Sequence, residues 1–172
     1  KAIFLDRDGT INIDTGFTYK TEDLKFEKGA IEGLQLLQNS NYKLIIVTGQ
    51  SGIGRGYYTE EDYFKFMQHM YSQLRRDGIN IDKDYFCPHH PTEAIGEYKV
   101  NCNCRKPRIG MLEQAAQDFD IDLTKSWGIG DKTDDIEAYR RANCKSILVK
   151  TGKAGQDKHF LVTPNYIAEN LY

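Results

Sequence analysis

The chain has 172 residues, of which 40% are hydrophobic and 28% are charged, a composition typical of one globular domain with its own core. Lys and Arg number 23 against 25 Asp and Glu, and this net charge of -2 argues against a general nucleic-acid binder, which needs a basic face. No apolar run approaches the roughly 20 residues that span a bilayer, and the N-terminus does not resemble a signal peptide. We therefore expect a cytoplasmic protein with a single domain over residues 1–172 that binds neither nucleic acid nor membrane.

Short apolar runs predict the strands of a buried parallel sheet. The first covers residues 2–5 and ends at Asp6, and the second covers 43–48. Three further runs are candidate strands: 85–86, 127–129 and 146–149. Helical patterns lie between them, at 30–37, 60–76, 111–119 and 136–142. Because strands alternate with helices, we predict an α/β fold with a doubly wound, mainly parallel sheet and helices on both faces.

The most regular helical pattern covers residues 60–76. Thr59 precedes it as an N-cap and Gly78 ends it. Its apolar residues recur at helical spacing and should face the core: Tyr63, Phe66, Met67, Met70, Tyr71 and Leu74. The tail after Gly152 has no comparable pattern.

Acidic residues follow two of the predicted strands. Asp6 and Asp8 come directly after 2–5, and Asp131 and Asp135 follow 127–129. Alone, a pair such as Asp6 and Asp8 is usually a pair of solvated turn residues. In a parallel sheet, however, ligands bind at the carboxyl ends of the strands, where both pairs should lie. Together the four carboxylates predict a site of hard oxygen ligands that suits Mg²⁺.

Such a site suits phosphoryl transfer, which needs a nucleophile, a group that handles the proton of the leaving oxygen, and cations around the phosphoryl oxygens. An Asp can be the nucleophile and form an aspartyl phosphate, and a second Asp can act as acid and then as base. Lys106 and Lys132 offer cations, Thr48 offers a hydroxyl, and residues 49–52 offer backbone N–H groups.

Three of the four cysteines, with one histidine, are spaced like metal ligands. They are Cys87, His89, Cys102 and Cys104, with twelve residues between the two pairs. Three thiolates and an imidazole suit a structural zinc ion, whereas free thiols or a disulfide are the alternatives. Zinc would order the aperiodic loop 87–104 and position Lys106, which lies two residues beyond Cys104. Cys144, beside a predicted strand, should be a buried free thiol.

These motifs, in this order, resemble the four motifs of haloacid dehalogenase superfamily phosphatases. The matching residues are Asp6-Arg7-Asp8-Gly9-Thr10, Thr48, Lys106, and Asp131 with Asp135. The segments 48–52, 87–91, 102–107 and 130–132 are similar to the branch that contains heptose-bisphosphate and histidinol-phosphate phosphatases. The resemblance implies a Rossmannoid core, a structural Zn²⁺ and no separate cap domain.

The resemblance also implies a role for each residue. Asp6 would be the nucleophile and a Mg²⁺ ligand, and Asp8 would be the general acid and base, with its backbone carbonyl on the metal. Asp131 would complete the Mg²⁺ ligands, Asp135 would support the site, and Thr48 and Lys106 would hold the phosphoryl group. The implied substrate contacts are Asp14, Gly16, Phe17, Gly49, Gln50, Ser51, Arg105 and Lys132. Gly49 stands where the heptose enzymes usually carry Asn.

We therefore expect a Mg²⁺-dependent phosphatase whose partner is a small phosphorylated sugar. The resemblance favours the 7-phosphate of D-glycero-D-manno-heptose 1,7-bisphosphate, in the synthesis of ADP- or GDP-heptose and of lipopolysaccharide or other surface glycans. Histidinol-phosphate phosphatase activity in histidine biosynthesis is the alternative. A non-catalytic, zinc-ordered binding module is a third hypothesis, which the intact acids and Lys106 disfavour. We expect a monomer.

Overall fold

The computed structural model describes residues 1–172, and six parallel strands form its single sheet in the order β3-β2-β1-β4-β5-β6. The strands are β1 (Ala2–Leu5), β2 (Lys43–Gly49), β3 (Lys83–Cys87), β4 (Trp127–Gly130), β5 (Lys145–Val149) and β6 (Tyr166–Ala168). The first five confirm the strand predictions. The predicted α/β class and the parallel sheet are likewise confirmed.

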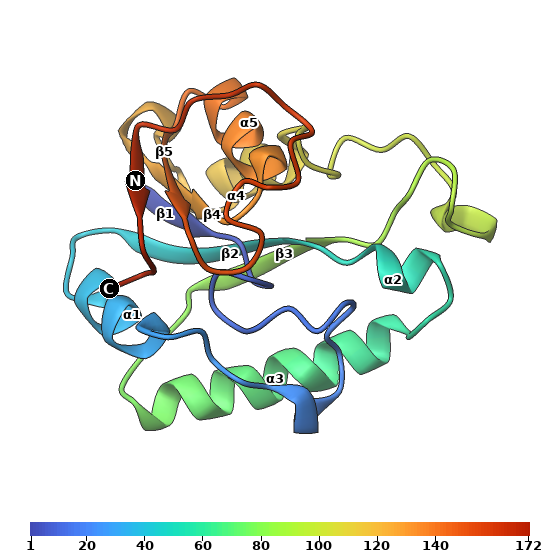
Figure 1. Cartoon of the computed structure of the whole chain (residues 1–172), viewed down its shortest axis with the longest axis horizontal. Coiled ribbons are helices and arrows are strands. Elements are labelled where there is room, and N and C mark those ends of the chain that lie inside the picture. Colours follow the sequence, from blue (N-terminus) through green and yellow to red (C-terminus); the bar gives the residue numbers. More distant parts are fainter.

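Helices cover both faces of the sheet, as predicted (Figure 1). The α-helices are α1 (Ala30–Gln38), α2 (Ser51–Gly54), α3 (Glu60–Arg76), α4 (Gly110–Phe119) and α5 (Thr133–Arg141). Three short 3-10 helices are η1 (Thr21–Asp23), η2 (Gly96–Tyr98) and η3 (Leu123–Lys125). In Figure 1, α1 and α3 lie below the sheet, and α4 and α5 lie above it. None of these helices combines the length and apolarity needed to cross a bilayer.

Strand β1 shows why the sheet needs both layers of helices. Side chains of a strand alternate between the two faces of its sheet. Ile3 and Leu5 join the core under α3, whereas Ala2 and Phe4 join the core under α4 and α5. All four are buried, so β1 is apolar throughout instead of alternating with polar residues.

Helix α3 forms where the sequence predicts it. Thr59 Oγ1 accepts a hydrogen bond from the backbone N–H of Asp62, and the Asp62 carboxylate accepts one from the backbone N–H of Thr59. Such a reciprocal cap stabilises a helix by about 1 kcal/mol. The predicted apolar face is buried, apart from Tyr71, which is half-buried.

Among the α-helices and strands, two were not predicted, α2 and β6. Both are too short to show a period in the sequence. Strand β6 extends the sheet beside β5, and the Asn165 side chain just before it accepts a hydrogen bond from the backbone N–H of Ser146. Between β5 and β6 the chain returns to the carboxyl ends of β1 and β4, where Thr151 Oγ1 donates to the Gly9 carbonyl. The tail therefore helps to build the site.

Candidate active site

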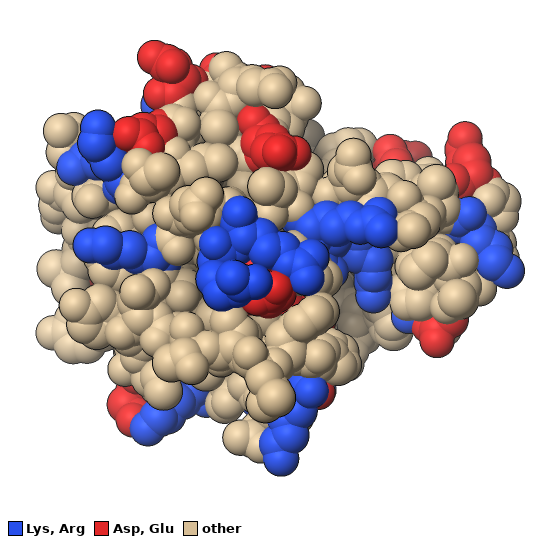
Figure 2. All heavy atoms as spheres, turned by 90° about the horizontal axis from the view of Figure 1, so that it is seen from above, with Lys and Arg blue, Asp and Glu red and all other residues tan.

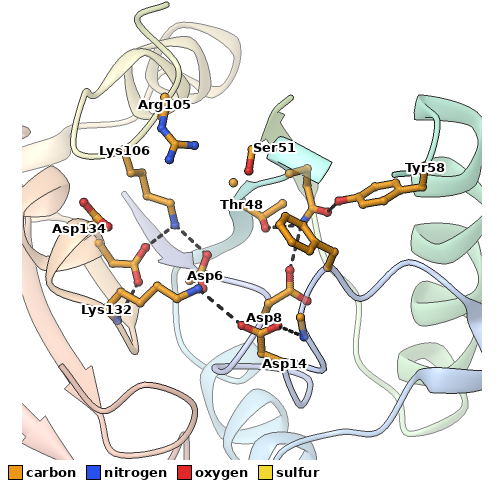
Figure 3. A pocket seen from close by; sticks show the side chains of 15 residues that line it. Asp6, Asp8, Asp14, Thr48, Ser51, Tyr58, Arg105, Lys106, Lys132 and Asp134 are labelled. Atoms are coloured by element: carbon orange, nitrogen blue, oxygen red, sulfur yellow. Dashed lines mark hydrogen bonds and ion pairs between the residues drawn. The ribbon is translucent and has the colours of Figure 1, made fainter. Parts of the chain in front are cut away.

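A pocket of about 280 Å³ opens at the carboxyl ends of the central strands. Figure 3 shows Asp6, Lys106 and Lys132 turned toward one another in it, with Tyr58 approaching from the opposite wall. Every residue predicted to bind the phosphoryl group or the substrate lines this pocket. Tyr58 and Asp134 also line it, and neither was predicted from the sequence. The lining residues are Asp6, Asp8, Asp14, Gly16, Phe17, Thr48, Gly49, Gln50, Ser51, Tyr58, Arg105, Lys106, Lys132, Asp134 and Asp135.

Lys106 joins the acids at the base of the pocket. Its Nζ lies 2.7 Å from Asp6 Oδ1, 2.5 Å from Asp135 Oδ1 and 2.9 Å from the Val47 carbonyl oxygen. Burial alone would lower the pKa of Lys106, but the carboxylates of Asp135 and Asp6 raise it. The lysine therefore stays charged, and its own ammonium group is a cation beside the Asp6 carboxylate.

Asp131 lies behind the pocket wall, fully buried, and forms an acidic cluster with Asp6 and Asp135. Its Oδ2 accepts a hydrogen bond of 2.6 Å from the backbone N–H of Lys153, whereas its buried Oδ1 has no partner. Burial, followed by the charges of Asp6 and Asp135, raises the pKa of Asp131 to about 8. Burial and Asp6 likewise raise the pKa of Asp135 to about 6, although Lys106 opposes this. Hard oxygens with one orphaned atom fit a divalent cation.

Two glycines leave room for the Asp131 carboxylate. Gly9 and Gly152 have φ angles of +84° and +55°, in the left-handed region that favours glycine. A Cβ on Gly9 would lie 2.5 Å from Asp131 Oδ2, and one on Gly152 would lie 2.3 Å from it. Any side chain at either position would displace this carboxylate.

Asp8 is surrounded by hydrogen-bond donors. Its carboxylate accepts from Arg7 Nη2 at 2.8 Å, from Asn12 Nδ2 at 3.0 Å and from Gln50 Nε2 at 3.0 Å. Arg7 is fully buried, donates to the Thr18 carbonyl and lies over the Phe66 ring. No local sequence pattern points to a role for Arg7, because Thr18 and Phe66, which enclose it beside Asp8, are not its neighbours in the chain.

The rim of the pocket is basic on one side and aromatic on the other. Lys132 Nζ lies 3.8 Å from Asp14 Oδ2, and Asp6, followed by Asp131, raises the pKa of Lys132 against the effect of burial. Arg105 and Lys132 thus supply fixed positive charge. Phe17 forms the aromatic side, packed edge-on against Tyr57. Figure 2 shows Lys and Arg gathered around a small acidic patch near the middle of one face.

The predicted zinc ligands come together at the start of the segment that carries Lys106. The sulfur atoms of Cys87 and Cys102 lie 3.1 and 3.2 Å from that of Cys104, and His89 Nδ1 lies 3.2 Å from the same sulfur. A disulfide would need about 2.05 Å, and all four cysteines are free. Three sulfurs and one imidazole nitrogen facing one another fit a tetrahedral zinc ion. Cys144 lies outside this cluster, buried as expected.

Comparison with known proteins identifies the family. A family model described as HAD-hydrolase-like matches residues 103–172. The D-glycero-beta-D-manno-heptose-1,7-bisphosphate 7-phosphatase of Pasteurella multocida is 47% identical over 154 residues, which cover 89% of this chain and 83% of that protein. The chain belongs to the haloacid dehalogenase-like phosphatases. The enzyme of the same name from Escherichia coli K12 is 40% identical over 153 residues, 88% of this chain and 80% of that protein.

Solved structures of the haloacid dehalogenase-like phosphatases share the fold. The D,D-heptose 1,7-bisphosphate phosphatase from B. bronchiseptica, solved with magnesium and phosphate, aligns with a TM-score of 0.88 and 29% identity over 99% of this chain and 93% of that chain. A putative HAD-like phosphatase from Mesorhizobium loti aligns with a TM-score of 0.83 and 31% identity over 88% and 73%. Like its relatives, this chain is a phosphoric monoester hydrolase.

Proposed function

We propose that this phosphatase removes the 7-phosphate of D-glycero-β-D-manno-heptose 1,7-bisphosphate. Its similarity to enzymes of that name supports the substrate. The observation that carries the proposal is the basic rim of Arg105 and Lys132, which lies beside the groups that would hold the transferred phosphoryl group. A bisphosphate has a second phosphate for this rim, whereas histidinol phosphate has only one phosphate.

In the first proposed step, Asp6 attacks the phosphorus of the 7-phosphate. Lys106 binds Oδ1 of Asp6 and no hydrogen bond engages Oδ2, which is therefore free to attack. As the new O–P bond forms, the bond from phosphorus to the sugar oxygen breaks, and Asp8 donates a proton to that oxygen. The products are an aspartyl phosphate and a free hydroxyl at C7.

In the second step, water attacks the phosphorus of the aspartyl phosphate and Asp8 accepts the proton of that water. The O–P bond to Asp6 breaks, inorganic phosphate leaves, and the Asp6 carboxylate is restored. The Lys106 ammonium and the Thr48 hydroxyl would bind the phosphoryl oxygens in both steps, where negative charge must be stabilised.

We propose Mg²⁺ as the cofactor of this site, held by the carboxylates of Asp6 and Asp131 and by the backbone carbonyl of Asp8, with Asp135 supporting them. The unpartnered Oδ1 of Asp131 supports this assignment, as does the magnesium in the B. bronchiseptica structure. When bound, the cation neutralises phosphoryl oxygens and reduces their repulsion by the attacking carboxylate.

We propose Zn²⁺ as the structural ion of the loop 87–104. Its ligands would be Cys87, His89, Cys102 and Cys104, whose donor atoms already face one another. Arg105 and Lys106 follow the last ligand directly. Binding of Cys104 to zinc would therefore hold both residues at the pocket wall: Arg105, the proposed contact of the second phosphate, and Lys106, which binds the acidic cluster.

The assignment is tested with a panel of phosphate esters: both anomers of the heptose bisphosphate, heptose 7-phosphate and histidinol phosphate, with Asp6→Asn as the inactive control. We expect the β-anomer of the bisphosphate to have the highest kcat/KM, at least about 10-fold above the monophosphates, because one additional ionic contact contributes 1.4 kcal/mol or more. Faster hydrolysis of histidinol phosphate would overturn the assignment. Absence of turnover on every ester would favour the binding-module hypothesis.

A further inference from the structure

The Gln50 side chain lies enclosed between β2 and α2, with only 2% of the residue exposed. Its amide makes three hydrogen bonds. Nε2 donates to Thr48 Oγ1 at 2.8 Å and to Asp8 Oδ2 at 3.0 Å, and Oε1 accepts from the Tyr58 hydroxyl at 2.5 Å. Both amide protons are therefore used inside the protein, and no donor of this side chain is left for a substrate.

Hydrogen-bond polarity fixes the orientation of this amide. Nε2 of Gln50 donates to Asp8 Oδ2 and Oε1 accepts from the Tyr58 hydroxyl, so the NH₂ group faces Asp8 and the carbonyl faces Tyr58. The same NH₂ group meets Thr48 Oγ1, which therefore accepts. Since Thr48 Oγ1 makes no other hydrogen bond, its own proton is free to be donated into the pocket. A phosphoryl oxygen is the acceptor that the proposed chemistry brings there.

Close packing fixes the position of the Tyr58 ring, and so of the hydroxyl that binds Gln50. Its ring stacks on Tyr19 with the centroids 4.6 Å apart and the planes 7° from parallel. A Cβ on Gly52 would lie 2.2 Å from the Tyr58 ring, so the glycine allows the ring to pack directly against α2. The tyrosine is buried, and its hydroxyl, which Figure 3 shows pointing into the site, donates to Gln50 Oε1.

We propose that Gln50, held by Tyr58, is a positioning residue that fixes the Asp8 carboxylate relative to the Thr48 hydroxyl. The proposal rests on the proposed function, in which Asp8 transfers the proton and Thr48 binds the phosphoryl group. Gln50 would thus couple the end of β1 to the end of β2. This differs from the direct substrate contact that the sequence resemblance implies for this residue.

The test compares Gln50→Leu, Tyr58→Phe and the double variant on two substrates, an alkyl phosphate ester that the wild type hydrolyses and 4-nitrophenyl phosphate. The nitrophenolate leaves without needing a proton, so a defect in Asp8 should affect it less. For Gln50→Leu we expect kcat/KM to fall about 100-fold on the alkyl ester and clearly less on the aryl ester, because general acid catalysis contributes about 10²–10⁴-fold. Tyr58→Phe should show the same pattern at about 10-fold.

The double variant gives the decisive comparison. If Tyr58 acts through Gln50, the double variant should be no slower than Gln50→Leu alone. Tyr71→Phe is the matched control, because it removes another 2.5 Å hydrogen bond, from Tyr71 to Asp84, away from the pocket. That variant should lower Tm and leave both kcat/KM values unchanged.

Equal losses on both esters, multiplicative losses in the double variant, or an effect on KM alone would each overturn the positioning role. If Gln50→Leu does not fold, as judged by Tm, the positioning role is tested with Tyr58→Phe alone, by the ratio of its kcat/KM values on the alkyl and the aryl ester. Wild-type turnover of the heptose bisphosphate tests the proposed function separately, since the ratio can be measured on any alkyl phosphate that the enzyme accepts.

Discussion

Nζ of Lys106 lies 2.7 Å from Oδ1 of Asp6, although the two residues are 100 positions apart in the chain. The contact joins the end of β1 to the segment that follows the Cys/His cluster. It leaves Oδ2 of Asp6 as the free oxygen and places a permanent cation next to it.

Replacing Asp6 by Asn should lower turnover by roughly 10⁴-fold or more, because an amide cannot form the aspartyl phosphate. Rapid quenching, cleavage after lysine and mass spectrometry should find a phosphorylated peptide 2–20 in the wild type and none in the variant. The control is Asp23→Asn, an exposed acid in η1 that does not line the pocket, which should keep wild-type rates. Near wild-type turnover of Asp6→Asn would exclude covalent catalysis by this residue.

Replacing Lys106 by Met should lower kcat by about 10²–10³-fold, the loss expected when one donor to a charged transition state is removed. The variant also leaves Asp6 and Asp135 without their buried partner, which typically costs about 3–5 kcal/mol of unfolding free energy. Urea denaturation measures this loss. Saturating Mg²⁺ should restore part of the stability and little of the rate. A variant as active as the wild type would show that Lys106 is only structural.

Without a divalent cation, stability should fall as pH rises. Asp131 and Asp135 have pKa values of about 8 and about 6 in the folded protein, above the ordinary value of 3.8. The folded state therefore keeps protons that the unfolded chain has lost, so the free energy of unfolding decreases between about pH 4 and pH 8. Mg²⁺ must displace these protons, and its binding should strengthen over the upper part of this range.

Scanning calorimetry in Mg²⁺-free buffer or with added Mg²⁺, at several pH values, measures both effects. The Mg²⁺-induced rise in Tm should be larger at pH 8 than at pH 6. In Asp131→Asn, which cannot ionise at that position, the Tm without Mg²⁺ should vary less with pH and the response to Mg²⁺ should be largely lost. An unchanged pH dependence in this variant would refute the assignment to Asp131.

Purified protein should contain one zinc ion per chain by elemental analysis, because four ligands form a closed structural site. Cys102→Ser should lose zinc and most activity, even with ample Mg²⁺, since Lys106 would no longer be held in place. Cys144→Ser is the matched control, a buried thiol outside the cluster, and should retain zinc. Full activity after zinc removal and Mg²⁺ replacement would show that the ion does not position Lys106.

Arg105→Met should raise KM for the heptose bisphosphate about 10-fold or more, the effect of losing a charged hydrogen bond to the second phosphate. The same variant should change KM for 4-nitrophenyl phosphate much less, since that ester has a single phosphate. Arg76→Met, at the end of α3 and remote from the pocket, is the control. Equal changes on both esters would place Arg105 at the transferred phosphoryl group instead.

The sequence predicts best those elements and site residues for which one local pattern is sufficient evidence. The apolar run of β1, the capped and periodic helix α3, and the acids that follow β1 and β4 were all predicted and lie where expected. The spacing of Cys87 and His89 relative to Cys102 and Cys104 likewise predicted a cluster that the fold assembles. Each of these signals depends on residues close in the chain or on the general rule that parallel strands end at one edge.

Local sequence patterns therefore predicted five of the six strands, four of the five α-helices and the family. Only the folded chain brings other side chains together: Arg7 lies over the Phe66 ring, Gly152 lies under Asp131, and the Gln50 amide lies between Thr48 and Asp8. The physical reason is that hydrogen bonds and close packing depend on distances of a few ångströms between residues far apart in the chain. Such distances leave no period or spacing in the sequence, and only the folded chain sets them.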